Sequence, residues 1–256
     1  MVKMIMHGAC GRMGRMITDI VSREEGIEIV AGVDAFGEAY ASYPVYKTLD
    51  EITEEADVVV DFSTASAVDG LISYCKAKKL PVVLCTTGLS TEQMEALREA
   101  SGEIPVLKSA NMSIGINLLL GVLRQISPVL SEAGFDIEVV EKHHNKKLDA
   151  PSGTAIALAD AVNEGLAADG EEEMEYIYDR STRRMARPKN EIGISAVRGG
   201  TIVGDHDVIF AGEDEVITLS HRAYSRAVFA KGAVTAAKFL KGKEPGYYGM
   251  EDALGL

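Results

Sequence analysis

The first half of the chain alternates short apolar segments rich in β-branched residues with amphipathic segments, and this alternation constrains the fold more than any other feature. Segments with the pattern of strands are residues 3–8, 28–34, 57–62, 80–85 and 104–108. Helical spacing separates them, at residues 12–23, 65–78 and 91–100. Strands joined through helices form right-handed crossovers, and hence a parallel sheet with helices on both faces. The expected class is α/β, with an amino-terminal Rossmann-like parallel sheet.

The pattern changes after Asn111. A long apolar helix is predicted over residues 113–130, a strand over 135–143 and a further helix from Ser152. Strands are then predicted at 192–198, 207–211 and 215–222, before a last helix at 226–240. Consecutive strands with few helices between them are typical of antiparallel pairing. We therefore expect a second, α+β domain built on a mostly antiparallel sheet.

Composition narrows the class of partner and the location. The chain has 256 residues, of which 46% are apolar, enough for one large or two modest cores. Its formal net charge of −13 would repel a phosphate backbone, so nucleic acid is not expected as a partner. Residues 1–6 lack the pattern of a signal peptide, and the longest apolar run, 114–123, is about half of the ~20 residues that span a membrane. A soluble cytoplasmic protein without membrane contact is expected.

Cysteine and histidine spacing gives no support for a metal centre or a disulfide framework. The cysteines are odd in number and lack paired metal-type spacing: Cys10, Cys75 and Cys85. His143 and His144 are adjacent, without the i, i+4 spacing of helical metal ligands. The other histidines stand apart from such neighbours and are interpreted as structural or hydrogen-bonded: His7, His206 and His221.

A glycine-rich turn follows the first predicted strand and opens the first predicted helix. It consists of Gly8, Ala9, Cys10, Gly11, Arg12, Met13 and Gly14. Glycines let the backbone turn sharply and approach a pyrophosphate, while N–H groups at the helix start face the anion. The same spacing occurs in plain structural turns. Asp34 ends the second predicted strand 20 residues after Gly14, where a carboxylate can accept hydrogen bonds from ribose hydroxyls, and this context favours a dinucleotide site.

Asp34 also bears on the choice of cofactor. Its carboxylate would repel the extra phosphate of NADPH, and Ala35 rather than an arginine follows it. We therefore expect NADH to be accepted or preferred. Binding of NADPH stays open as an alternative, because Arg12 or a distant lysine could pair with that phosphate.

A basic segment stands out in this acidic chain. It carries Lys142, His143, His144, Lys146 and Lys147 within six residues, and Pro151-Ser152-Gly153-Thr154 follows at the start of an alanine-rich helix. A capped helix start favours a bound anion such as a carboxylate, while histidine and lysine supply protons and charge. The segment therefore suits an acid and anion site for reducing an imine. A well-capped helix beside a solvated loop would contain the same residues, and the segment alone does not decide between the two.

Four segments together resemble the dihydrodipicolinate reductase family, also called 4-hydroxy-tetrahydrodipicolinate reductase. They are the glycine turn, residues 82–88 (VVLCTTG), residues 109–117 (SANMSIGIN) and residues 141–154 (EKHHNKKLDAPSGT). The last is highly specific to the family, whereas the glycine turn is not. The resemblance continues along the whole chain, through residues 192–200, 204–206 and 220–226.

The resemblance implies a homotetrameric enzyme of the diaminopimelate route to lysine. Such an enzyme reduces a cyclic imine dicarboxylate, 4-hydroxy-tetrahydrodipicolinate, to tetrahydrodipicolinate with a hydride from NAD(P)H. The resemblance assigns residues 1–112 and 225–256 to a dinucleotide-binding domain, and residues 113–224 to a domain for substrate binding and oligomerisation.

Individual roles follow by position in the family pattern. His143 would be the proton donor or acceptor and Lys147 the proton donor. His144, Gly153 and Thr154 would hold a substrate carboxylate. The cofactor would be lined by Gly8, Ala9, Cys10, Gly11, Arg12, Met13, Asp34, Cys85, Thr86, Thr87, Ala110, Asn111, Met112 and Ser113.

The sequence departs from the family pattern at two places. Cys85 stands where members usually have glycine, which narrows the space beside the nicotinamide. The segment 180–187 keeps its end arginines but has Thr182 and Met185 in place of two glycines, which puts loop motion over the site in doubt.

Two alternative functions remain open from the sequence. Another NAD(P)-dependent dehydrogenase of similar fold would keep hydride transfer and change the substrate. A semialdehyde type would need a nucleophilic cysteine beside the histidines, yet all three cysteines precede the second domain. A non-catalytic dinucleotide sensor would have no need for histidine, lysine and an anion-binding helix in one segment.

Overall fold

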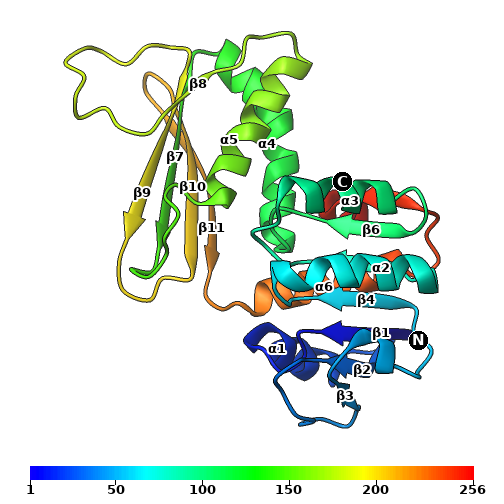
Figure 1. The fold of residues 1–256 in the computed structure, drawn as a ribbon. Helices are drawn as coiled ribbons and strands as arrows, with labels where there is room; N and C mark the ends of the chain where they lie inside the picture. The colour runs from blue at the N-terminus through cyan, green and yellow to red at the C-terminus, as the bar shows by residue number, and fades with distance from the viewer. The chain divides into compact units, whose positions relative to one another are not determined.

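The computed structural model describes residues 1–256 and divides into two compact units. Unit 1 consists of Met1–Ile114 and Ala227–Leu256, so it is assembled from both ends of the chain. Unit 2 consists of Gly115–Arg226. The ribbon in Figure 1 shows a separate sheet in each unit.

Unit 1 contains a seven-stranded sheet in the order β12-β6-β5-β4-β1-β2-β3, in which every pairing is parallel. Its strands are β1 (Val2–His7), β2 (Ile27–Val33), β3 (Val45–Tyr46), β4 (Val58–Asp61), β5 (Val82–Leu84), β6 (Pro105–Lys108) and β12 (Gly246–Tyr248). From β1 the chain first moves toward β2 and β3, and later returns to build β4, β5 and β6 on the other side. The carboxyl ends of β1 and β4 therefore form the switch point at which sheets of this type bind ligands.

Helices cover both faces of the unit 1 sheet. They are α1 (Arg12–Val21), α2 (Val68–Lys78), α3 (Thr91–Ala100), α6 (Ala227–Leu240) and α7 (Met250–Leu254), with short 3-10 turns η1 (Leu49–Glu51) and η2 (Ala65–Ala67). Successive side chains of a strand point to opposite faces, so Met4 and Met6 of β1 enter the core beneath α1 and α6. Ile5 enters the core beneath α2 and α3. The sheet is thus buried on both faces, as its nearly continuous apolar strands predict.

Unit 2 contains a five-stranded sheet in the order β11-β10-β7-β9-β8. Its strands are β7 (Asp136–His143), β8 (Glu175–Ile177), β9 (Glu191–Arg198), β10 (Gly204–Ala211) and β11 (Val216–Ala223). The helices α4 (Ile114–Glu132) and α5 (Gly153–Ala168) pack on one face of this sheet (Figure 1). Val208 and Phe210 of β10 lie in the core between sheet and helices.

The fold class is confirmed, with one correction to the second sheet. We predicted a mostly antiparallel sheet, but the sheet is mixed. β10 pairs antiparallel with β7 and β11, whereas β9 pairs parallel with β7 and β8. The reason is that α5 follows β7 and brings the next strand, β8, back in the same direction. Residues 178–190 then return the chain once more, so that β9 also runs parallel to β8 and β7. The prediction also missed β3, β8, β12 and α7, which are two to five residues long.

Helix α4 is long and apolar enough, by length and composition alone, to cross a membrane. In the structure its Ile116, Leu120 and Leu123 lie in the unit 2 core, against Ile137 and Val139 of β7. A core helix has the same composition as a membrane span, so α4 is weak evidence for a membrane.

Candidate active site

The glycine turn, residues 8–14, connects β1 to α1 at the switch point of unit 1. Gly8 has φ +82°, and a Cβ there would lie 2.5 Å from the carbonyl oxygen of Phe62. A Cβ at Gly14 would lie 2.3 Å from the carbonyl oxygen of Ala9. Gly11 precedes α1 without a side-chain cap, so the first N–H groups of the helix remain available to an anion. The turn therefore fits the pyrophosphate of a dinucleotide.

Asp34 lies beside this turn, where the sequence places it, and its carboxylate accepts three backbone hydrogen bonds. Oδ2 accepts from the N–H of Cys10 at 2.9 Å. Oδ1 accepts from the N–H groups of Phe36 at 3.1 Å and Gly37 at 2.8 Å. Asp34 thus ties the glycine turn to the loop after β2. Hydrogen bonding of Asp34 to ribose hydroxyls stays a prediction.

Two further polar contacts lie along the carboxyl edge of the same sheet. His7 ends β1 and Asp61 ends β4, and His7 Nδ1 lies 2.8 Å from Asp61 Oδ1 with both side chains buried. Lys108 ends β6 and donates from Nζ to the carbonyl oxygen of Thr86 at 3.1 Å. Burial lowers the pKa of Lys108, against the raising effect of Cys85 and Asp61. His7 is hydrogen-bonded, as the sequence predicts, but its pairing with Asp61 follows from the neighbouring positions of β1 and β4.

The remaining residues predicted to line the cofactor lie in unit 1. Cys85 and Thr86 follow β5, and burial raises the pKa of the Cys85 thiol. Asn111 Oδ1 accepts from the N–H of Ser113 at 2.8 Å, which shapes the segment Ala110–Ser113 that precedes α4. Met112 lies in the core of unit 1, against α6. The structure therefore gathers all of the predicted cofactor residues in one unit, while their contacts with a cofactor stay predictions.

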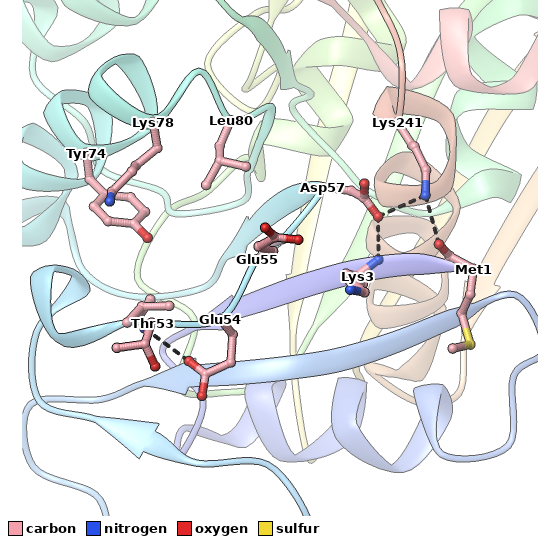
Figure 2. Close-up of a pocket in the computed structure, with 12 residues that line it drawn as sticks. Met1, Lys3, Thr53, Glu54, Glu55, Asp57, Tyr74, Lys78, Leu80 and Lys241 are labelled. Atoms are coloured by element: carbon pink, nitrogen blue, oxygen red, sulfur yellow. Dashed lines mark hydrogen bonds and ion pairs between the residues drawn. The ribbon is translucent and has the colours of Figure 1, made fainter.

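Unit 1 has cavities at both edges of its sheet. A cavity of about 250 Å³ lies at the carboxyl edge, lined by Gly8, Gly11, Asp34 and Phe62 among others. A cavity of about 520 Å³ lies at the amino edge, where Lys3, Glu55, Tyr74 and Lys241 contribute to its wall (Figure 2). Lys241 donates from Nζ to Asp57 Oδ2 at 2.9 Å there. Only the first of these cavities contains residues of the predicted dinucleotide site.

In unit 2, the side of the sheet that faces the helices changes from apolar to polar toward one end. Ile137 and Val139 of β7 lie in the core, and the next two residues on that face are Glu141 and His143. His206 of β10 pairs with Glu141, and Arg198 of β9 pairs with His143. Four polar side chains from three strands therefore meet where the apolar core ends.

Glu141 is fully buried and is the centre of this group. Its two oxygens accept from the two terminal nitrogens of Arg198, each at 2.7 Å, and Oε1 accepts from the N–H of Ser152 at 2.9 Å. Its Oε2 lies 2.6 Å from His143 Nδ1. Burial alone would raise the pKa of Glu141, but the hydrogen bonds from Arg198, His143 and Ser152 outweigh it and lower the pKa. Glu141 is therefore a buried carboxylate that stays ionised.

His143 is buried and held by its neighbours. Its ring meets the ring of His206 edge to face, with 5.1 Å between centroids. Burial lowers the pKa of His143, Glu141 opposes this shift, and Lys147 and Arg198 add to it. Since Nδ1 faces Glu141, a neutral ring with its proton on Nδ1 leaves a lone pair on Nε2. The geometry thus prepares Nε2 to accept or return a proton.

His206 completes the buried part of the site. Its Nε2 lies 3.2 Å from the hydroxyl of Ser152, the residue that caps α5. Burial and the nearby His143 lower the pKa of His206 to about 4. His206 is hydrogen-bonded, as the sequence predicts, and it supports both His143 and the start of α5.

Lys147 and His144 lie on the loop that follows β7. Lys147 Nζ forms an ion pair with Asp149 Oδ2 at 2.9 Å, and its backbone N–H donates to the carbonyl oxygen of His144 at 3.2 Å. His144 Nδ1 is buried without a hydrogen-bond partner. Lys147 is close enough to lower the pKa of His143, so the two proposed proton-transfer residues belong to one electrostatic group.

The start of α5 lies beside these residues. Ser152 is its N-cap, and its hydroxyl accepts from the N–H of Ala155 at 3.2 Å. Gly153 and Thr154 are its first two residues. A Cβ at Gly153 would meet no atom within 4 Å, so open space lies at the helix start, where backbone N–H groups favour an anion. The structure thus brings His143, His144, Lys147, Gly153 and Thr154 together in one unit.

The sequence did not predict that Arg198 contacts Glu141, or that Glu141 and His206 contact His143. One signal was available, because residues two apart on a strand share a face and Glu141 precedes His143 by two. The contributions of Arg198 and His206 depend on which strands neighbour β7, and this order was not predictable from local patterns.

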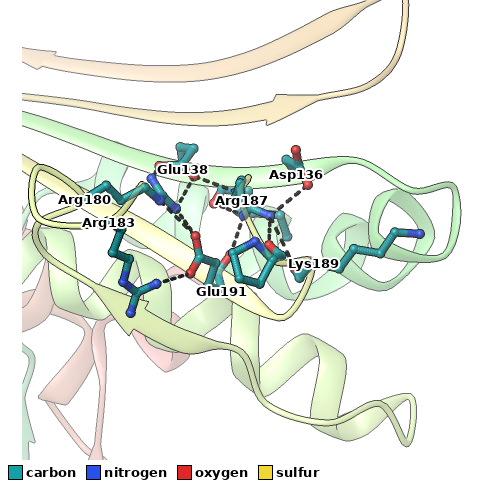
Figure 3. Close-up of polar contacts among 9 residues, drawn as sticks. Asp136, Glu138, Arg180, Arg183, Arg187, Lys189 and Glu191 are labelled. Atoms are coloured by element: carbon teal, nitrogen blue, oxygen red, sulfur yellow. Dashed lines mark hydrogen bonds and ion pairs between the residues drawn. The ribbon is translucent and has the colours of Figure 1, made fainter. Parts of the chain in front are cut away.

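The segment 180–187 is fixed to the other face of the unit 2 sheet by arginines (Figure 3). Arg180 forms two hydrogen bonds with Glu138, at 2.8 and 2.9 Å, and Arg183 pairs with Glu191 at 2.9 Å. Arg187 pairs with Asp136 at 2.8 Å. A Cβ at Gly193 would lie 1.9 Å from Glu138 Oε2, so this glycine makes room for the network. The network fixes both ends of the segment that lacks the two family glycines.

Comparison with known proteins identifies the family. Residues 2–112 match the model described as "Dihydrodipicolinate reductase, N-terminus", and residues 115–254 match "Dihydrodipicolinate reductase, C-terminus". The chain belongs to the dihydrodipicolinate reductase family. The chain is 53% identical to the 4-hydroxy-tetrahydrodipicolinate reductase of Caldanaerobacter subterraneus subsp. tengcongensis over 98% of both chains. It is 51% identical to that of Clostridium tetani over 98% of this chain and 96% of the relative.

Solved structures agree with this family. A dihydrodipicolinate reductase from Paenisporosarcina sp. TG-14 with bound dipicolinate has a TM-score of 0.78 and 25% identity, over 98% of both chains. A probable dehydrogenase from Thermotoga maritima has a TM-score of 0.62 at 12% identity, over 98% of this chain and 92% of that chain, which shows a shared fold alone. The dihydrodipicolinate reductase family is thus supported by sequence and by fold.

Proposed function

We propose that this chain reduces 4-hydroxy-tetrahydrodipicolinate to tetrahydrodipicolinate with a hydride from NAD(P)H. The observation that carries the proposal is the polar group at the start of α5, beside Lys147. In it Arg198 pairs with Glu141, and Glu141 contacts His143 and Ser152, all three of which are buried. A non-catalytic sensor of dinucleotides has no use for an ionised carboxylate that orients a histidine. The names of the relatives in C. subterraneus and C. tetani support the same substrate.

Substrate binding is assigned to the start of α5 and to His144. The substrate is a dicarboxylate, as is the dipicolinate bound to the relative from Paenisporosarcina. Backbone N–H groups at Gly153 and Thr154 and the dipole of α5 would hold one carboxylate in the open space beside Gly153. His144 would donate to the same group.

Proton transfer is assigned to His143 and Lys147. Glu141 orients the His143 ring, and Arg198 keeps Glu141 ionised, so that Nε2 of His143 is the atom that takes or gives a proton. The Lys147 ammonium group supplies a proton and a positive charge. A cofactor held at the glycine turn would supply the hydride. We also propose that residues 1–112 and 225–256 form a dinucleotide-binding domain and residues 113–224 a substrate domain. The division of the chain into Met1–Ile114 with Ala227–Leu256, and Gly115–Arg226, supports this proposal.

Assembly into a homotetramer in the cytoplasm is also proposed. The face of the unit 2 sheet opposite α4 and α5 exposes apolar residues, including Val197 and Val216. Such a face suits association with a second copy. Light scattering of the purified protein should give a mass about four times that of the 27.4 kDa chain, and a monomer would contradict this part of the proposal.

The function is tested by following cofactor absorbance with the condensation product of pyruvate and aspartate semialdehyde. Oxidation of NADH or NADPH that requires this product is expected. No oxidation of either cofactor would contradict the substrate assignment. Oxidation with other imines or aldehydes instead would favour the alternative of a different dehydrogenase on the same fold.

A further inference from the structure

A second, larger cavity adjoins the 250 Å³ cavity beside the glycine turn of unit 1. Its volume is about 600 Å³. It shares His7, Val33, Ala35 and Ala67 with the 250 Å³ cavity of the glycine turn. A dinucleotide whose ribose lies near Asp34 therefore has this second cavity beside its adenosine end.

Lys47 contributes a positive charge to the wall of this larger cavity. Its place is fixed by β3, because the N–H of Asp34 donates to the carbonyl oxygen of Tyr46 at 2.9 Å and Lys47 comes next. Lys47 Nζ donates to the carbonyl oxygen of Gly37 at 2.6 Å, in the loop held by Asp34. The carboxylate of Glu51 accepts from the backbone N–H of Lys47 at 3.0 Å, whereas Lys47 Nζ donates to the Gly37 carbonyl oxygen. An ammonium group has three donors, so two remain for an anion.

Asp34 is less repulsive to a phosphate than its charge suggests. Three backbone N–H groups, from Cys10, Phe36 and Gly37, point at its carboxylate. Hydrogen bonds of this kind disperse the negative charge of a carboxylate. Asp34 therefore still suits a ribose hydroxyl, but it does not exclude a phosphate that has its own cation nearby.

We propose that Lys47 binds the 2′-phosphate of NADPH and thereby sets how tightly NADPH binds relative to NADH beside Asp34. The proposal rests on the proposed function, because it requires a dinucleotide at the glycine turn. It assigns cofactor choice to a lysine that enters from β3, thirteen positions beyond Asp34 in sequence.

The test measures binding by calorimetry rather than turnover. NADPH, NADH, 2′,5′-ADP and 5′-AMP are titrated into the wild-type protein and into Lys47→Met. We expect Lys47→Met to weaken binding of NADPH and 2′,5′-ADP about tenfold, the effect of one charge-assisted contact. Binding of NADH and 5′-AMP should change less than about twofold, because they lack the phosphate that the charge contacts.

Two further variants make the test specific. Lys47→Arg keeps the charge and should retain NADPH binding. Lys78→Met removes the same charge from the far end of the same cavity, near Tyr74, and should change neither cofactor's affinity. Equal weakening by Lys78→Met would overturn the assignment, since it would indicate a general field effect.

The outcomes separate this inference from the proposed function. NADPH binding that is unchanged in Lys47→Met, with NADH binding intact, overturns the role of Lys47 alone. Failure of the wild-type protein to bind either dinucleotide overturns the dinucleotide site and the inference together. If Lys47→Met weakens the binding of NADH and of NADPH by the same factor, the role of Lys47 in phosphate binding is also overturned. Lys47 would then only hold the loop at Gly37.

Discussion

The glycine turn of unit 1 is built from backbone atoms, whereas a group of side chains forms the site in unit 2. We call this the Glu141 group, and it consists of Glu141, His143, Ser152, Arg198 and His206. In the turn, Gly8 and Gly14 leave space because they have no Cβ, and the N–H of Cys10 donates to Asp34. The first N–H groups of α1 complete the turn. The Glu141 group is made of side chains from three strands and the cap of α5. The turn depends on the absence of Cβ atoms at its glycines, whereas the Glu141 group depends on hydrogen bonds between specific side chains. The two should therefore fail in different ways when they are altered.

The largest effect is expected in the side-chain site. His143→Ala and Lys147→Ala should each lower kcat by about 10³-fold, the usual contribution of a positioned acid or base. Affinity for NADH should stay unchanged, because neither residue belongs to the unit that carries the glycine turn. Steady-state kinetics and fluorescence titration with NADH measure the two quantities. Lys146→Ala, an exposed neighbour, is the matched control, and turnover of both variants equal to that of the control would contradict the catalytic assignment.

The backbone site should respond to a single methyl group. Gly8→Ala places a Cβ 2.5 Å from the carbonyl oxygen of Phe62 at φ +82°, and should lower the free energy of unfolding by about 3 kcal/mol and remove NADH binding. Gly26→Ala is the control, since Gly26 has φ +83° but open space around its Cβ. It should cost only the backbone strain, about 1 kcal/mol, and leave NADH binding intact. Equal losses in urea unfolding would show that the close approach to Phe62 is unimportant.

The same contrast explains how much was predictable from sequence. The glycine turn, the strand before it and the position of Asp34 are local in sequence, so periodicity and spacing predict them. The three N–H groups on Asp34 were not predicted, because the loop after β2 has no pattern that fixes its path. Arg198 lies 57 positions from Glu141, and their contact requires that β9 neighbour β7.

Errors in the second sheet have a similar origin. The mixed order of the sheet depends on where the chain re-enters after α5, which no local residue pattern specifies. Short strands such as β8 and β12 contain three residues, too few to show a period of two. Their existence depends on pairing with a neighbour that is already in place.

An intermediate effect is expected for the pH dependence of stability. The pKa of His206 is about 4 in the folded protein, against 6.5 for an ordinary histidine. The folded state excludes a proton that the unfolded state binds, so the stabilising contribution of the neutral ring is present above pH 6.5 and is lost as the pH falls toward 4. Between pH 7 and pH 5 this loss should amount to about 2 kcal/mol.

The comparison that isolates this effect uses His206→Gln, which cannot titrate. Urea unfolding of both proteins at pH 7 and pH 5 gives the change in free energy for each. The wild-type protein should lose about 2 kcal/mol more than the variant. Equal losses would mean that His206 does not remain neutral in the folded protein.

The smallest effect concerns Gly153, the glycine with which α5 begins. At Gly153, Ala would add a Cβ that meets no atom within 4 Å, so the fold should keep its stability or gain up to about 1 kcal/mol from a better helix former. If a substrate carboxylate occupies that space, KM should rise about tenfold while kcat changes little, because the methyl group obstructs binding and leaves His143 in place.

Gly165→Ala in the same helix is the opposite case, since its Cβ would lie 2.5 Å from the carbonyl oxygen of Arg124. That variant should lose stability and keep its KM. A variant of Gly153 with normal KM would move the carboxylate away from the start of α5, and would leave the Glu141 group without the anion site that makes it a site for a dicarboxylate.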